Sequence, residues 1–339
     1  MGRRDGSIPL GVGPHRGGFP LPPTILHPGR YGRSCQMKTP LSGAFPVLAT
    51  PFRSNGAIDE TDFLSIIRFA LESAVDGVVY PGVASEVETL SEEERRNQVD
   101  LLAREIDGRI PIIIGGSDPD PAVAARHVNH AAEIGAAAVM VMAPGHLGNS
   151  IEAQTEYFQH VAANATIPIM LQNQPKPIGA GLTPEEVAAV ASAVDRVRYI
   201  KEETPPCGQH LTRIKNAVGG SVDAIFGGAG GRYVMDEMAR GAAGTMPACE
   251  LADIHAMMIR SWHQGDVATA RRLYSVSLPL LTFQAIFRMH MTKEVLRRRG
   301  VVRNTFVRAK GPKLDDGDRA ELTLLLQEAS LPYKHHRPV

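Results

Sequence analysis

The sequence predicts an α/β protein, a (β/α)8 TIM barrel with a helical appendage at its C-terminal end. The first observation is a unit that repeats from residue 43 onward, in which a short apolar strand, a turn and an amphipathic helix follow one another. The second is that the strands are continuously apolar, as in a parallel sheet covered by helices. Eight such units favour a closed barrel, and the 339 residues exceed the roughly 250 that one barrel needs.

Eight short apolar segments are the predicted strands, and they span residues 43–49, 77–80, 110–115, 137–142, 168–171, 198–201, 224–227 and 243–247. Helices are predicted between them, among others over 60–73, 91–106, 121–134, 151–163 and 184–194. Two helix starts carry clear signals. Thr183 precedes Pro184 and two acids, and Ser91 is followed by Glu94, the spacing of a capping box.

The ends of the chain differ from this repeat. Helices are predicted over 251–263, 267–277, 280–299 and 318–328, with Pro279 marking a break between the second and third. We therefore expect a barrel over residues 37–250, followed by C-terminal helices and a tail over 251–339. Residues 1–36 are rich in Gly, Pro and Arg and show no period, which predicts a disordered extension. A transit peptide is the alternative, but such Pro and Gly density does not form an amphipathic helix.

Charge and cysteine content exclude several classes of function. The chain has 36 Lys and Arg against 36 Asp and Glu, so neither nucleic acid nor an anionic membrane is expected as a partner. No apolar run approaches the roughly 18 residues that cross a bilayer. Its three cysteines match neither a disulfide framework nor a zinc site. These observations predict a cytoplasmic protein without a metal or cofactor.

Lys201 is the residue that points most directly to chemistry. It ends an apolar strand, and the active site of such a barrel lies where the strands end. Burying an ammonium group is costly, which favours the neutral, nucleophilic amine that a Schiff-base enzyme uses against a ketone. The alternative is an ordinary ion pair with Glu202 or Glu203. Polar and glycine-containing segments also end other strands, at residues 81–86, 143–146, 172–175, 227–228 and 246–247.

The motifs at these strand ends resemble those of the dihydrodipicolinate synthase/N-acetylneuraminate lyase family, over about residues 42–300. The matching segments are Phe45–Phe52, Gly82–Leu90, Leu171–Pro175 and Ile200–Glu202. The resemblance implies that Lys201 forms an imine with the C2 carbonyl of a 2-oxo acid. It also implies a homotetramer, and a small-molecule 2-oxo acid as the binding partner.

The sequence departs from this family at the residues that move protons. Gln172 stands where the synthases and lyases have a tyrosine, and an amide neither gives nor takes a proton near neutral pH. Val83 and Ala84 replace paired threonines, so backbone N–H groups and the Ser85 hydroxyl remain to bind the substrate carboxylate. His146 falls at the aromatic residue of the synthase relay. Synthase and sialic-acid lyase activities are therefore disfavoured.

Glu203 is the candidate that replaces the missing acid and base. It lies two residues after Lys201, so in a continuing strand both side chains point to the same side. The combination of Lys201, Glu203 and Gln172 resembles the 2-keto-3-deoxy-L-arabonate dehydratase branch of the family. That resemblance implies the loss of water from 2-keto-3-deoxy-L-arabonate to give 2-oxoglutarate semialdehyde. The alternatives for these residues are an ion pair for Glu203 and a neutral filler for Gln172.

The sequence thus predicts a lyase that dehydrates a 2-keto-3-deoxy sugar acid through a Schiff base. The predicted catalytic residues are Lys201 and Glu203. The predicted substrate-binding residues are Val83, Ala84, Ser85, His146, Gln172, Gly228 and Met246. Two alternatives stay open: a class I retro-aldolase that releases pyruvate, against which Gln172 argues, and a non-catalytic protein that binds 2-oxo acids.

Overall fold

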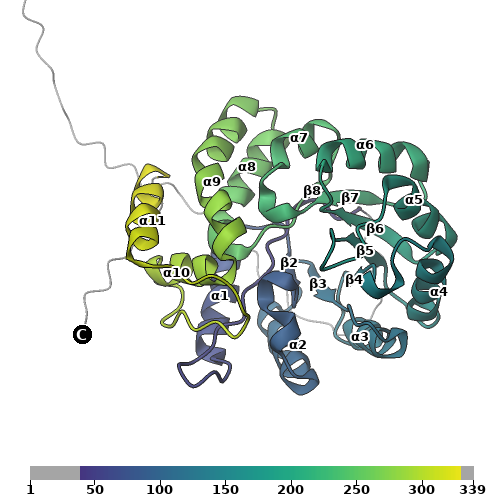
Figure 1. The fold of residues 1–339 in the computed structure, drawn as a ribbon, viewed down its shortest axis with the longest axis horizontal. Helices are drawn as coiled ribbons and strands as arrows, with labels where there is room; N and C mark the ends of the chain where they lie inside the picture. The colour runs from purple at the N-terminus through teal and green to yellow at the C-terminus, as the bar shows by residue number, and fades with distance from the viewer. Residues whose placement is uncertain (1–38, 330–339) are drawn as a thin grey trace, which may run out of the picture. The chain divides into compact units, whose positions relative to one another are not determined.

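Eight parallel strands form the centre of the protein. The computed structural model describes residues 39–329, which belong to one compact unit. The strands are ordered β1-β8-β7-β6-β5-β4-β3-β2, and a parallel bridge between Val47 and Val79 joins the two ends of this series. The predicted (β/α)8 barrel is therefore confirmed (Figure 1). The disordered extension predicted over 1–36 lies outside the described residues.

The strands lie within or close to the predicted ranges. They are β1 (Gly43–Ala44), β2 (Val78–Tyr80), β3 (Ile112–Gly115), β4 (Ala138–Met142), β5 (Ile169–Asn173), β6 (Val197–Glu202), β7 (Ala224–Gly227) and β8 (Gly244–Thr245). The contact between β1 and β8 is unusually close. A Cβ atom added at Gly244 would lie 1.8 Å from the carbonyl oxygen of Gly43, so this pairing requires glycine.

Eight helices surround the strands. They are α1 (Glu60–Glu72), α2 (Glu92–Ile106), α3 (Pro121–Glu133), α4 (Ile151–Ala162), α5 (Pro184–Ala193), α6 (Cys207–Val218), α7 (Val234–Ala239) and α8 (Ala252–His263). The predicted helix starts are confirmed, because Ser91 with Glu94 and Thr183 with Glu186 form capping boxes. Each box satisfies two backbone N–H groups that the helix leaves free. No helix among residues 39–329 is long and apolar enough to cross a membrane.

A separate apolar cluster fills the inside of the barrel. Its larger members are Phe45, Val79, Ile113, Met140, Met170, Tyr199, Phe226 and Met246. Phe45 and Phe226 meet edge to face at 5.5 Å between ring centroids. Such aromatic pairs add about 0.5–1.5 kcal/mol beyond the apolar area they bury. This packing fills the barrel interior with apolar side chains.

The C-terminal helices correct one prediction. Helix α9 (Val267–Phe287) runs through Pro279 without a break. Proline removes a single backbone hydrogen bond, and α9, which packs against α8, continues past it. The chain turns instead at Arg288, between α9 and α10 (Met289–Arg298), and α11 (Asp316–Glu328) follows. Because α8 packs against β1 as the eighth helix, the predicted division at residue 250 falls inside the last β/α unit.

Candidate active site

Lys201 lies at the end of β6 with its amine beside a carboxylate. Its Nζ is 3.3 Å from Oε1 of Glu203, and both side chains are about nine-tenths buried or more. Gln172 pairs with Lys201 in register across β5 and β6, and partners in register point to the same face. The three side chains thus meet inside the mouth of the barrel. The alternation that predicted a common side for Lys201 and Glu203 is confirmed.

Glu203 is held by several hydrogen-bond donors. Gln172 Nε2 donates to its Oε1 at 2.7 Å, and the backbone N–H of Ala229 donates to its Oε2 at 3.0 Å. The amide of Gln174, with its nitrogen turned toward the carboxylate, donates to Oε1 at 2.7 Å and to Oε2 at 3.2 Å. These contacts fix the carboxylate in place beside the lysine. Because amides cannot exchange a proton near neutral pH, Glu203 is the group of this cluster suited to general acid and base work.

Gly228 makes room for this carboxylate rather than contacting the cavity. A Cβ atom at Gly228 would lie 2.4 Å from Cγ and 2.8 Å from Oε2 of Glu203. Real Cβ atoms do not approach so closely, so any other residue here would displace Glu203. Gly228 was predicted to bind substrate, but in the structure its lack of a side chain leaves room for Glu203.

A cavity of about 280 Å³ opens next to Lys201 and Glu203. Of the predicted substrate-binding residues it brings together Val83, Ala84, Gln172 and Met246. Val83 and Ala84 begin the short helix η1 (Val83–Ser85), and their backbone N–H groups have no hydrogen-bond partner within residues 39–329. Free amides at the edge of a cavity suit a carboxylate ligand. Among the residues that line this cavity, Glu203 is the one acid.

Ser85 and His146 do not line the cavity. Ser85 is fully buried, where its hydroxyl donates to the carbonyl of Leu48 at 2.5 Å and accepts from the N–H of Gly82 at 2.9 Å. Its hydroxyl therefore holds the loop and is not free for the substrate carboxylate. His146 lies in η3 (Gly145–Leu147), where it is exposed. The sequence placed both residues at strand ends correctly but could not show where their side chains point.

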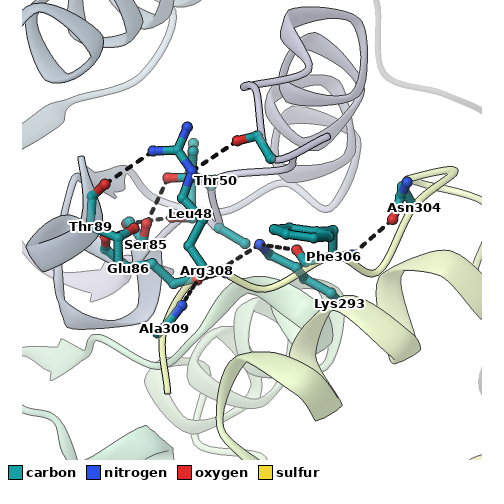
Figure 2. A network of polar contacts seen from close by, with 12 residues as sticks. Leu48, Thr50, Ser85, Glu86, Thr89, Lys293, Asn304, Phe306, Arg308 and Ala309 are labelled. Carbon is teal, nitrogen blue, oxygen red and sulfur yellow. Dashed lines mark hydrogen bonds and ion pairs between the residues drawn. The ribbon is translucent and has the colours of Figure 1, made fainter. Parts of the chain in front are cut away.

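The loop that carries Val83 and Ala84 is held by a buried ion pair. Figure 2 shows Glu86 and Lys293, whose Nζ lies 2.5 Å from Glu86 Oε1. Lys293 also donates to the carbonyl of Phe306 at 2.8 Å, and the second carboxylate oxygen accepts from the N–H groups of Arg308 and Ala309, each at 2.7 Å. Burial lowers the pKa of Lys293 to about 8. Through these contacts Glu86 braces the loop.

Polar residues on the opposite face of the strands serve the fold. Glu202 points outward, where it accepts from Asn173 Nδ2 at 2.8 Å and from the N–H of Thr204 at 2.7 Å. Glu237, on α7, lies behind β7 with both carboxyl oxygens buried and without a hydrogen-bond partner in the described part of the chain. Burial, with the nearby charges of Glu203 and Glu202, raises the pKa of Glu237 to about 8. This raised pKa favours the protonated form of Glu237 at neutral pH.

Five polar residues around the cavity escaped the sequence analysis: Gln174, Arg232, Tyr233, Gln284 and Arg288. Gln174 could have been found, because it lies two residues after Gln172 and so on the same face of the chain. Arg232 and Tyr233 follow the glycine-rich turn after β7, a weaker signal of the same kind. Arg288 depends on where α9 ends, which the sequence pattern misplaced.

Comparisons with known proteins agree with this architecture. A sequence model of the Dihydrodipicolinate synthetase family matches residues 40–329. The chain is 28% identical over 285 residues to the L-2-keto-3-deoxyarabonate dehydratase of Azospirillum brasilense, covering 83% of this chain and 92% of that protein. It is 27% identical over 249 residues to the probable 2-dehydro-3-deoxy-D-pentonate aldolase of Escherichia coli (strain K12), covering 72% and 82%.

A solved structure shows the same fold. The crystal structure of dihydrodipicolinate synthase from Rhodopseudomonas palustris matches 85% of this chain and 97% of its own, with a TM-score of 0.76 and 25% sequence identity. The relatives named here include a dehydratase, a probable aldolase and a synthase. The barrel, the strand-end lysine and the match over residues 40–329 together show that this chain belongs to the Dihydrodipicolinate synthetase family of lyases.

Proposed function

We propose that the protein is a Schiff-base hydro-lyase that removes water from a 2-keto-3-deoxy sugar acid. The observation that carries this proposal is the pair formed by Lys201 and Glu203, 3.3 Å apart beside the cavity. A lysine supplies the nucleophile for a 2-oxo group, and the neighbouring carboxylate supplies a base next to the resulting iminium. Among the cavity-lining residues no other acid competes with Glu203 for this task.

In the proposed reaction Lys201 first passes a proton to Glu203, and the neutral amine attacks C2 of the substrate to form a carbinolamine. The hydroxyl group of the carbinolamine takes that proton from Glu203 and leaves as water, which gives an iminium beside the Glu203 carboxylate. The free N–H groups of Val83 and Ala84 receive the C1 carboxylate. Glu203 then takes a proton from C3, and the electron pair of that C–H bond forms an enamine. The enamine expels the C4 hydroxyl group, which leaves as water after taking the proton back from Glu203. Hydrolysis of the conjugated iminium releases the product and restores the lysine.

For 2-keto-3-deoxy-L-arabonate, a proton shift from C5 to C3 turns the unsaturated product into a C4–C5 enol. This enol takes up a proton at C4 and loses its hydroxyl proton, which gives 2-oxoglutarate semialdehyde. The named dehydratase of Azospirillum brasilense supports this acid as the first substrate to test. Gln172 and Gln174 support dehydration in a second way. They hold the carboxylate with amides, so they steady Glu203 without competing for its proton.

A second candidate function is a retro-aldolase. Tyr233 lines the cavity, and a phenol there could accept the C4 hydroxyl proton that carbon–carbon cleavage must remove. The named aldolase of Escherichia coli supports this alternative. However, Tyr233 is 42% exposed and its phenol has no hydrogen-bond partner among residues 39–329, whereas Glu203 has several. We therefore place dehydration first.

Product analysis distinguishes the two reactions. Incubation with 2-keto-3-deoxy-L-arabonate, followed by NMR and mass spectrometry, should show 2-oxoglutarate semialdehyde and no pyruvate. Pyruvate with glycolaldehyde would instead establish the aldolase. The Lys201→Ala variant serves as the control, because loss of the amine should abolish either product. Product formation at a normal rate by this variant would refute the Schiff-base mechanism itself.

A further inference from the structure

Two arginines line the cavity beside Lys201 and take no part in the mechanism above. Arg232 follows η4 (Ala229–Gly231) at the end of β7, and Arg288 joins α9 to α10. The side chain of neither forms an ion pair or a hydrogen bond with any residue from 39 to 329. A guanidinium group facing a cavity without an anion is suited to receive one from a ligand.

The charges around the cavity are unbalanced. Glu203 is paired with Lys201, so the two arginines remain as an excess of positive charge. The iminium formed on Lys201 keeps its positive charge beside Glu203. One substrate carboxylate would therefore leave one arginine without a counter-charge. A second anionic group on the same substrate would match both.

The arginines approach the cavity from a different wall than the free amides. Val83 and Ala84 follow β2, whereas Arg232 follows β7, and β1 and β8 stand between these two strands. Arg288 comes from the helices beyond the barrel. A substrate whose C1 carboxylate lies at the amides, with C2 at Lys201, therefore has its far end available to the arginines.

The backbone at Arg288 points to the same conclusion. Arg288 has φ 47° and ψ −121°, in a region where glycine is free of strain and other residues are not. Such a conformation strains a non-glycine residue. Glycine would remove the strain, so an arginine at this turn points to a task for its side chain.

We propose that Arg232 and Arg288 bind a second anionic group, a carboxylate or a phosphate, at the far end of the substrate. The inference rests on the proposed function for the reaction and names the substrate class more narrowly. The substrates are 2-keto-3-deoxy acids with an anionic terminus, and acids that end in a hydroxymethyl group, such as the L-arabonate derivative, bind more weakly. Planar guanidinium groups match the geometry of carboxylate and phosphate oxygens.

The kinetic test uses three six-carbon 2-keto-3-deoxy acids that differ only in C6, which is a hydroxymethyl group, a carboxylate or a phosphorylated hydroxymethyl group. We expect kcat/KM for at least one anionic acid to exceed that of the hydroxymethyl acid by about ten- to a hundredfold, as for one charge-assisted hydrogen bond. The variants Arg288→Gln and Arg232→Gln should remove that preference by raising KM. Arg96→Gln, an exposed arginine on α2, controls for net charge. Equal kcat/KM for all three acids would overturn the proposal.

A binding test keeps this inference separate from the enzyme claim. Calorimetry compares 2-oxoglutarate with 2-oxopentanoate, two five-carbon 2-oxo acids that differ in a terminal carboxylate. Tighter binding of 2-oxoglutarate by about tenfold or more, lost in the two arginine variants, would support the second anion site even if no acid is turned over. Equal loss of affinity for both acids would instead place the arginines at the C1 carboxylate and overturn the inference.

Discussion

At the residue scale, the site consists of a lysine beside a carboxylate that is held by amides. Lys201, Glu203 and Gln172 could be predicted from the sequence, because strand alternation fixes which side chains share a face. Ser85 and Gly228 show the limit of that reasoning. Both were predicted to bind substrate, yet one hydroxyl is used inside the loop and the glycine provides space. Sequence spacing says which segments meet, but hydrogen bonds inside a loop depend on the folded backbone.

Replacing Glu203 by glutamine separates imine formation from proton transfer. The amide keeps the size of the side chain but cannot take the C3 proton, so we expect kcat to fall by at least about a hundredfold. Trapping of the imine on Lys201 should persist. Steady-state kinetics and borohydride trapping on the same preparation measure both effects. Near-normal turnover would rule out Glu203 as the base.

The space at Gly228 gives a second prediction. In Gly228→Ala the new methyl group would lie 2.4 Å from Cγ of Glu203, which is too close. The Glu203 side chain would have to move, and its carboxylate would be displaced from Lys201. We expect turnover to fall by about tenfold or more while the fold stays intact, since a misplaced catalytic group loses most of its effect. Gly311→Ala is the matched control, because a Cβ atom there meets nothing within 4 Å. Unchanged kinetics in Gly228→Ala would mean that Glu203 tolerates displacement.

At the scale of elements, the strands and most helix starts could be predicted, because apolar runs and capping residues are local signals. The connection between α9 and α10 could not, since Pro279 gave a misleading local signal and the turn at Arg288 depends on packing. The position of the segment 304–309 could not be predicted from the sequence either. These residues contact both Glu86 and Lys293, which pair directly although 207 residues separate them in the sequence (Figure 2).

Breaking this buried pair should destabilise the protein. In Lys293→Met the Glu86 carboxylate stays buried with only the N–H groups of Arg308 and Ala309 to accept from. We expect the free energy of unfolding to fall by about 3–5 kcal/mol, measured by urea denaturation. Adding Glu86→Gln should restore part of the loss, because it removes the unpaired charge. Lys310→Met, at an exposed position, is the control, and an equal effect there would contradict this account.

At the scale of the whole molecule, buried acids give the stability a dependence on pH. Glu237 has its pKa raised to about 8 by burial, so between about pH 4.5 and 8 the folded protein holds a proton that the unfolded chain has released. The free energy of unfolding therefore falls as pH rises through this window, by about 1.4 kcal/mol per pH unit for one such proton. Burial raises the pKa of Glu250 to about 7, which adds to the same trend.

The variant Glu237→Gln tests this dependence. The amide carries no titrating proton, so the melting temperature should fall less between pH 6 and pH 9 than it does in the unaltered protein. The exposed Glu156→Gln should leave the slope unchanged. Parallel curves for Glu237→Gln and the unaltered protein would show that Glu237 is ionised when folded.

The homotetramer and the cytoplasmic location remain predictions. Light scattering can check the first of them.

The most direct test of the central claim is a trapping experiment on Lys201. The protein is treated with borohydride in the presence of 2-keto-3-deoxy-L-arabonate. The mass of the adduct is measured by mass spectrometry of the intact protein, and the modified residue is located by peptide mapping. We expect an adduct on Lys201 whose mass shows the loss of one water beyond imine formation. A pyruvate-sized adduct would mean carbon–carbon cleavage, and no adduct with this acid or with pyruvate would contradict the Schiff-base account.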